Sequence, residues 1–231
     1  MEHFPIPFGA IRSYQQGQMK VLHVNRSQPR TVVINGKKVS TAIYKEPVTG
    51  AVPVGKMTLE DDAQVDRRYH GGEYQAVYAY PVEHYPHWEK QLGVPSFPPG
   101  MFGENLTTQG LLETEICIGD ILQAGEVVMQ VTSARIPCSK LGHKLNKPDI
   151  LKSFLQSGYS GFYLRVLKEG TISAGATVEI TTRDPRQISV RELLGLHRLG
   201  EGTRERIEQV MQIEALAPIV RKDLVARLKK M

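Results

Sequence analysis

The chain has few cysteines and no long apolar run, and both shortages restrict the kind of protein it can be. Two cysteines among 231 residues, Cys117 and Cys138, do not make the disulfide framework of a small secreted protein. No apolar stretch approaches the roughly 20 residues of a membrane-spanning helix. The first residues, Met1–Pro7, lack the charged and apolar regions of a secretory signal. We therefore expect a cytoplasmic protein that has no membrane partner.

Motifs for the common redox cofactors are also missing. The sequence contains no Gly-x-Gly-x-x-Gly run, no Walker loop and no Cys-x-x-Cys pair. His84 and His87 could suggest a metal pair, but no cluster of Cys, Asp or Glu accompanies them, and Pro86 spoils a helical two-histidine face. We expect both histidines to be ordinary surface residues. The chain is expected to carry no flavin, nicotinamide or iron–sulfur site of its own.

The net charge of +5 is modestly basic and does not by itself select a partner. Nucleic acid is one interpretation, with the basic C-terminal tail as the binding module. No long Lys/Arg cluster interleaved with aromatic residues supports it. A few converging cations would equally well bind a small anion such as a phosphate. Nucleic-acid binding is therefore the weakest of the hypotheses considered.

Short strands separated by Gly, Pro and Asn fill most of the chain and predict a mainly β fold, a barrel or a sandwich. The predicted strands are Met19–Val24, Arg30–Ile34, Ala76–Tyr80, Ile116–Leu122, Val127–Ala134, Phe162–Leu167 and Thr177–Thr181. Asn35-Gly36 predicts a tight hairpin, and Ala124–Glu126 predicts another turn. Two short helices are expected at Val82–Lys90 and Asp149–Leu155.

The pattern becomes helical in the last part of the chain. Ser189–Glu192 fits a capping box that opens a first helix. Thr203–Gln212 has apolar residues at helical spacing, and Pro218 can take the first position of a third helix. Three helices in so short a segment form an appendage that needs a larger neighbour for stability. We predict a β-barrel domain at 1–186 and a three-helix unit at 187–231.

The segment around Cys138 carries the strongest chemical signal. Pro137 has no amide hydrogen, so the strand Val127–Ala134 is expected to stop before the cysteine and to present its thiol at a sheet edge or barrel mouth. Arg135 and Lys140 flank it, and nearby cations favour the thiolate, which attacks electrophiles or binds a soft metal. The alternative is an inert, buried cysteine.

Two polar loops are further candidates. Asp66–Gly72 contains Arg67, Arg68 and His70 beside Gly71 and Gly72, a set suited to binding an oxyanion. Its alternative is a solvated polar loop. Phe102–Leu111 contains Glu104 and Asn105. The amide of Asn105 can read the edge of a heterocycle, or it can bond the backbone of its own turn. Cys117, inside an alternating apolar strand, is expected to be a core residue.

Taken in order, these segments resemble the MOSC family, the domain related to the C-terminal part of molybdenum cofactor sulfurase. The resemblance is carried by Asp66–Gly72, Phe102–Leu106, Ile118–Asp120 and Arg135–Lys140. It is strongest to the YiiM-type branch, in which a three-helix unit follows the barrel. One departure is Thr58–Asp62, which stands where the family often has Gly-Leu-x-Gly-Asp, so that Asp62 is only a marginal site candidate.

The resemblance implies a β-barrel that binds the molybdenum cofactor (molybdopterin), with Cys138 as metal ligand and catalytic residue. It implies phosphate contacts from Arg67, Arg68 and Lys140, and a pterin contact from Asn105. Arg135 would supply further positive charge. His70, Gly71, Gly72 and Glu104 would belong to the walls of the pocket.

The resemblance also implies a reaction, the reduction of N-hydroxylated compounds such as hydroxylamino-purine base analogues. Because the chain has no electron-carrier motif, a separate reductase, a flavoprotein or similar, is expected to supply electrons. An alternative is a non-catalytic carrier in which Cys138 holds sulfur as a persulfide or passes the cofactor on. The C-terminal helices could dock the reductase, or could simply cover one end of the barrel.

Overall fold

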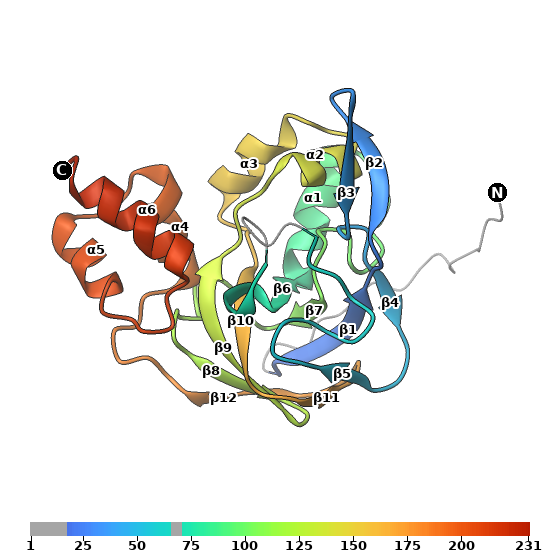
Figure 1. The fold of residues 1–231 in the computed structure, drawn as a ribbon, viewed down its shortest axis with the longest axis horizontal. Coiled ribbons are helices and arrows are strands. Elements are labelled where there is room, and N and C mark those ends of the chain that lie inside the picture. The colour runs from blue at the N-terminus through green and yellow to red at the C-terminus, as the bar shows by residue number, and fades with distance from the viewer. Residues whose placement is uncertain (1–17, 66–70) are drawn as a thin grey trace.

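The computed structural model describes residues 18–65 and 71–231, and its main feature is a large mixed sheet (Figure 1). The strands pair in the order β12-β8-β9-β10-β6-β7-β1-β4, and β6 and β7 run parallel. The strands of this sheet are β1 (Lys20–Arg26), β4 (Glu46–Val48), β6 (Val77–Pro81), β7 (Leu106–Gln109), β8 (Ile121–Ala124), β9 (Val127–Ala134), β10 (Phe162–Lys168) and β12 (Val178–Thr182). Two smaller pairs join β2 (Arg30–Ile34) to β3 (Lys37–Thr41), and β5 (Val52–Val54) to β11 (Gly170–Ile172).

The large sheet closes where β12, the strand at one end, meets the first residues of β1. The N–H of Val21 donates to the carbonyl of Ala176 at 2.9 Å, and the N–H of Val178 donates to the carbonyl of Met19 at 2.8 Å. Ala176 leads directly into β12, so the strands from β12 to β1 form a ring. The mainly β, barrel-type fold predicted from the sequence is confirmed.

Turn residues set the hairpins where the sequence predicts them. Asn35 and Gly36 both have positive φ, 50° and 74°, which the tight turn between β2 and β3 requires. Gly125 turns β8 into β9 with a φ of 59°. A Cβ at Gly125 would lie 2.9 Å from the carbonyl oxygen of Thr171, so only glycine fits this turn.

The predicted strand Ile116–Leu122 is wrong over its first five residues, because β8 begins only at Ile121. The carboxylate of Asp120 accepts the backbone N–H of Cys117 at 2.9 Å and turns the chain away from the ladder. Cys117 instead forms an isolated bridge with Ser189, which ties the C-terminal region to the barrel. Its side chain is buried, as predicted.

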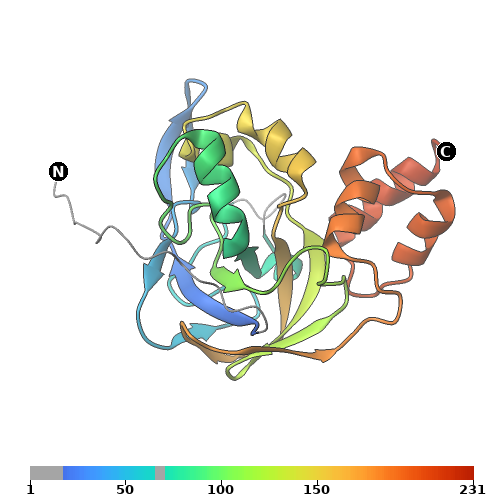
Figure 2. The same cartoon turned by 180° about the vertical axis from the view of Figure 1, so that it is seen from behind.

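Three helices gather at one end of the barrel, beside the β2–β3 hairpin (Figures 1 and 2). They are α1 (Tyr85–Leu92), α2 (Ser139–Lys144) and α3 (Ile150–Ser157). The first and third match predicted helices, and α2 was not predicted. An aromatic cluster fills the space between these helices and the barrel: Tyr78, Tyr80, Tyr85, Trp88, Phe97, Phe102 and Phe154.

The C-terminal helices α4 (Val190–Leu194), α5 (Arg204–Val210) and α6 (Pro218–Leu228) lie beside the barrel. A single turn of π-helix, η3 (Gly195–Leu199), follows α4. The predicted caps are present, since Ser189 Oγ accepts the N–H of Glu192 at 3.0 Å and Pro218 opens α6. The apolar residues of these helices belong to the same core cluster as those of the barrel. The boundary at 186/187 stays a prediction. Within the described residues, no helix has the length and apolarity to cross a bilayer.

Candidate functional site

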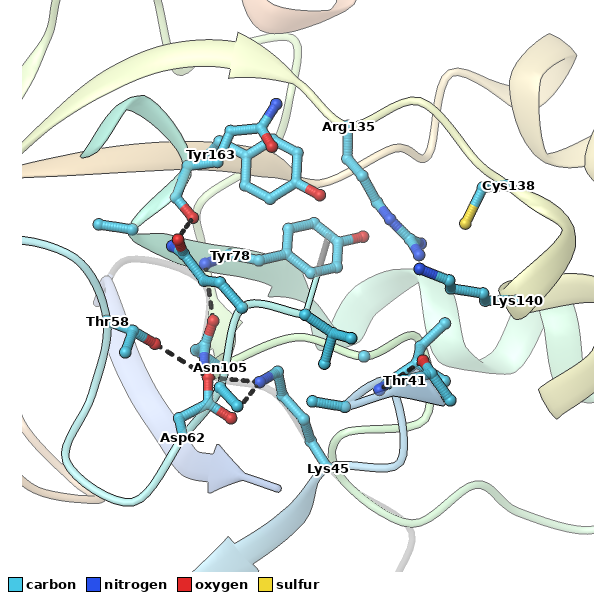
Figure 3. A pocket seen from close by; sticks show the side chains of 18 residues that line it. Thr41, Lys45, Thr58, Asp62, Tyr78, Asn105, Arg135, Cys138, Lys140 and Tyr163 are labelled. Carbon is cyan, nitrogen blue, oxygen red and sulfur yellow. Dashed lines mark hydrogen bonds and ion pairs between the residues drawn. The ribbon is translucent and has the colours of Figure 1, made fainter. Parts of the chain in front are cut away.

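Cys138 lies four residues beyond β9 and immediately before α2. The strand ends at Ala134, before Pro137, as the sequence predicts. The backbone at Cys138 is still extended, with φ −133° and ψ 171°. Its side chain is partly exposed and points into a pocket (Figure 3). Cys138 is therefore not a buried cysteine.

The pocket encloses about 660 Å³, its open mouth included. Segments that are far apart in the sequence meet around the pocket. They are the β3–β4 connection, the loop that ends at residue 65, the start of β6, the residues that follow β9, and the strand β10. Four of the predicted site residues line it: Asn105, Arg135, Cys138 and Lys140.

Arg135 is the most buried cation of the pocket wall, with 4% of its surface exposed. Its guanidinium carbon lies 4.9 Å from the ring centre of Tyr78 and 5.7 Å from that of Phe154. Nη1 is buried and has no hydrogen-bond partner among residues 18–65 and 71–231. Leaving such a donor unsatisfied is costly, so this atom fits a ligand that accepts a hydrogen bond.

Two tyrosines beside Arg135 remain neutral hydroxyl groups. Burial raises the pKa of Tyr78 and of Tyr163, and the positive charge of Arg135 offsets only part of this effect. Burial also opposes the charge of Arg135, but its interactions with the oxygen atoms of both tyrosines and with Cys138 outweigh this effect and raise the pKa of the guanidinium. The pocket therefore contains a fixed positive charge next to the thiol.

The charge of a second cation of the wall, Lys45, is paired with a buried carboxylate. Its Nζ lies 2.5 Å from Asp62 Oδ1, and Asp62 also accepts from Asn105 Nδ2 at 2.8 Å and from Thr58 Oγ1 at 3.1 Å. Asn105 Oδ1 accepts the backbone N–H of Tyr78 at 3.1 Å. The amide of Asn105 thus holds the pocket wall together. This role is closer to the alternative in which the side chain bonds the backbone than to the one in which it reads the edge of a heterocycle. Its predicted pterin contact stays a prediction.

Glu104 is fully buried and organises the loop that precedes β7. Its carboxylate accepts the backbone N–H of Gly100 and that of Phe102, each at 2.9 Å, and the hydroxyl of Tyr85. Glu104 does not line the pocket. It shapes the loop that brings the neighbouring Asn105 to the wall, a supporting role that the sequence did not indicate.

The first predicted loop is described only in part. Arg67, Arg68 and His70 lie outside the described residues. Gly71 and Gly72 are described but do not line the pocket. Gly72 has a φ of 85°, and its N–H donates to Gln64 Oε1 at 2.8 Å.

Gly72 opens the short helix η1 (Glu73–Gln75), which delivers Gln75 to the pocket wall. The Oε1 atom of Gln75 is buried and has no hydrogen-bond partner within the described ranges. Sequence reasoning missed Gln75, Lys45 and Tyr163. No local motif marks these residues, because their proximity arises from pairing between distant segments.

The prediction that His84 is a surface residue is wrong. His84 is buried, its Nε2 lies 2.6 Å from Glu113 Oε2, and its ring stacks on Tyr159 with 4.0 Å between ring centres. Glu113 offsets the cost of burying the polar ring, and this pairing is not visible in the local sequence. His87 is exposed, as predicted.

The comparisons with known proteins agree with this geometry. The model of the MOSC domain family matches residues 66–179, which include the predicted loops and Cys138. The uncharacterized protein YflK of Bacillus subtilis is 43% identical over 177 residues, which make up 77% of this chain and 80% of YflK. A protein named Reductase from Gibberella moniliformis is 34% identical over 151 residues, 64% of this chain but only 27% of that protein.

A solved structure extends the likeness to the C-terminal helices. The crystal structure of YiiM from Geobacillus stearothermophilus has a TM-score of 0.78 and 36% sequence identity to this chain. The match covers 91% of this chain and 99% of that one. The likeness therefore includes both the barrel and the helical unit.

Proposed function

Because the chain belongs to the MOSC domain family, as a protein of the YiiM type, we propose that it reduces N-hydroxylated compounds with a molybdenum cofactor held at Cys138. The observation that carries this proposal is the position of Cys138 beside Arg135, whose buried Nη1 has no partner among the described residues. A soft sulfur donor and an unsatisfied cationic donor on one wall suit a metal-bearing, anionic ligand.

The residues present fit such a cofactor. Cys138 supplies a sulfur ligand for the metal, and Arg135 and Lys140, which both line the pocket, supply charge for a phosphate (Figure 3). The unpartnered Oε1 of Gln75 can accept a hydrogen bond from a pterin N–H. Within the described residues, no cluster of three His, Cys, Asp or Glu side chains could hold a metal ion.

The cofactor, when bound, supplies the two-electron chemistry that reduces an N–O bond. The residues of the chain position the reactants and control their charge. Arg135 favours the anionic form of the sulfur at Cys138. Tyr78 donates its hydroxyl hydrogen to the carbonyl of Ser160 at 2.8 Å, which fixes its ring beside Arg135.

The overall reaction is balanced by electrons from outside the chain. An N-hydroxylated compound takes up two electrons and two protons and gives the amine and water. We propose that a separate reductase, a flavoprotein or similar, delivers the electrons. We also propose that the protein acts in the cytoplasm.

The C-terminal helices offer little support for nucleic-acid binding. Arg206 pairs with Glu192, and Arg221 donates to the carbonyls of Met211 and Ile213. Arg227 also donates within the helical unit. These guanidinium groups are paired within the helical unit, so that Lys222, Lys229 and Lys230 are left as its exposed cations for a phosphate.

The test is the molybdenum and pterin content of protein made in a host that produces the cofactor. Wild type should contain both and should reduce a hydroxylamino-purine with an artificial electron donor. Cys138→Ser should lose the activity and most of the metal. Cys117→Ser, a buried cysteine outside the pocket, is the matched control and should keep both. Full activity of Cys138→Ser would refute the proposal, and cofactor binding without turnover would favour the carrier alternative.

A further inference from the structure

A second hollow lies where the C-terminal helices meet the barrel, and it reaches the same cysteine. It encloses about 690 Å³, its open side included. Gln75, Cys138 and Tyr163 belong both to its wall and to the wall of the first pocket. The opposite wall comes from η3 and α6. Cys138 therefore stands between two spaces.

The helical wall of this hollow is fixed to the barrel. The N–H of Ala217, directly before α6, donates to the carbonyl of Thr132 in β9 at 3.2 Å. The guanidinium of Arg221 in α6 donates to the carbonyl of Ile213 at 2.7 Å, which holds the preceding loop against the helix. The hollow is thus a part of the folded structure with a defined shape.

The two spaces differ in charge. The first contains Arg135 and Lys140, which are suited to an anion. In the second, the charge of Arg198 is paired with Asp223 at 3.2 Å. The same carboxylate lies 2.9 Å from Nε2 of His197. The second hollow therefore suits an uncharged ligand.

The remaining surface of the hollow favours a partly apolar molecule. Burial lowers the pKa of His197, and Asp223 offsets only part of that shift, so the ring is neutral near pH 7. Ile136, Ile219 and Val220 supply apolar contacts. Mostly apolar walls with a few fixed polar groups are typical of sites for small organic ligands.

We propose that this hollow binds the body of the N-hydroxylated substrate, an uncharged planar heterocycle, and that η3 and α6 thereby select which substrates reach Cys138. This inference rests on the proposed function. It adds the place where the substrate binds and the elements, η3 and α6, that select it. Gln75 lies at the boundary of the two spaces, and its unpartnered Oε1 has two lone pairs, so it can accept an N–H of the heterocycle in addition to one from the pterin.

Two residues of α6 provide a matched test. Ile219 and Val225 are each 37% exposed, but only Ile219 lines the hollow. In cofactor-loaded protein, Ile219→Trp should raise the KM for a hydroxylamino-purine by roughly tenfold, because the indole occupies the ligand's space. The kcat and the KM for the much smaller substrate hydroxylamine should change little. Val225→Trp should behave as wild type for both substrates.

A second measurement does not depend on activity. In cofactor-free protein, the alkylation rate of Cys138 by iodoacetamide is followed by mass spectrometry of its peptide. Ile219→Trp should slow the labelling, and so should Val65→Trp, which narrows the first pocket. The two together should slow it most. Val225→Trp should leave the rate unchanged.

The outcomes separate the two proposals. If wild type reduces hydroxylamino-purine but Ile219→Trp matches Val225→Trp in KM, the hollow is not the substrate site, although the proposed function stands. If no protein turns over, the proposed function fails. The alkylation rate of Cys138 is then the remaining test. Slower labelling in Ile219→Trp supports the conclusion that η3 and α6 control access to Cys138. A wild-type rate in Ile219→Trp, alone and combined with Val65→Trp, overturns it.

Discussion

Lys45 Nζ lies 2.5 Å from both carboxylate oxygens of Asp62, and the two side chains are only 8% and 3% exposed. Burial lowers the pKa of Lys45, and attraction to Asp62 opposes that shift. The pair joins the β3–β4 connection to the loop that follows β5. It therefore fixes two separate segments of the pocket wall relative to each other.

Removing one member of this pair should lower the free energy of unfolding. Asp62→Asn leaves the ammonium of Lys45 buried without its counter-charge, so the free energy of unfolding should fall by roughly 3 kcal/mol. Urea denaturation measures it. Asp61→Asn, next in sequence, removes only an exposed pair with Arg26 and should cost less than about 1 kcal/mol. Equal losses in the two variants would contradict the structural role of Asp62.

The stability should depend on pH through Lys144. Burial lowers its pKa to about 8 from the ordinary 10.5, and attraction to Glu104 offsets only part of this. Between these values the unfolded chain binds a proton that the folded protein does not, so the Lys144 contribution to the free energy of unfolding rises with pH. The rise is at most about 3 kcal/mol, because one pKa unit corresponds to about 1.4 kcal/mol.

Urea denaturation of wild type and Lys144→Met at several pH values between about 7.5 and 9.5 checks this contribution. The stability of wild type relative to the variant should increase over that range. A difference that stays constant with pH would show that Lys144 keeps its proton throughout.

Arg135 should matter more for cofactor binding than for stability. In Arg135→Met, the loss of the contact with Tyr78 is offset by removal of the unsatisfied Nη1, so we expect the free energy of unfolding to change by less than about 1 kcal/mol. The molybdenum and pterin content should nevertheless fall severalfold. Arg165→Met, which removes an arginine stacked on Tyr74 outside the pocket, should keep the cofactor. Equal retention by both variants would exclude Arg135 as an anion ligand.

The barrel and the C-terminal helices should unfold together, because their apolar residues form one core cluster. Trp88 is the only tryptophan of the chain and reports on the aromatic cluster below α1. Its fluorescence and the far-ultraviolet circular dichroism should give the same urea midpoint. Two separate midpoints would instead support independent folding of 1–186 and 187–231.

Local chemistry made much of the fold predictable. Pro137 ends β9 because it cannot donate to a ladder, and Asn35-Gly36 forms the hairpin because both residues tolerate positive φ. Ser189 and Pro218 mark helix starts for similar local reasons. Each of these features depends on the residue and its near neighbours, which a sequence shows directly.

Long-range pairing was not predictable in the same way. His84 has the sequence context of a surface residue, but Glu113 provides a buried partner. The first half of the stretch Ile116–Leu122 has the alternation of a strand, but Asp120 turns the chain. At the site, Cys138 was marked by its own neighbours, whereas Lys45 was not marked because its role depends on contacts with distant loops.

The bond between Val21 and Ala176 has a consequence for biosynthesis. The first strand of the ring leaves the ribosome early, and β4 soon pairs with its second half, but Lys20 and Val21 have no partner on that side until almost the whole barrel sequence has been translated. A nascent chain therefore exposes an unpaired strand edge for most of its synthesis, and such edges are prone to aggregation. Chaperone contacts should be concentrated on chains that stop before this closing segment has emerged.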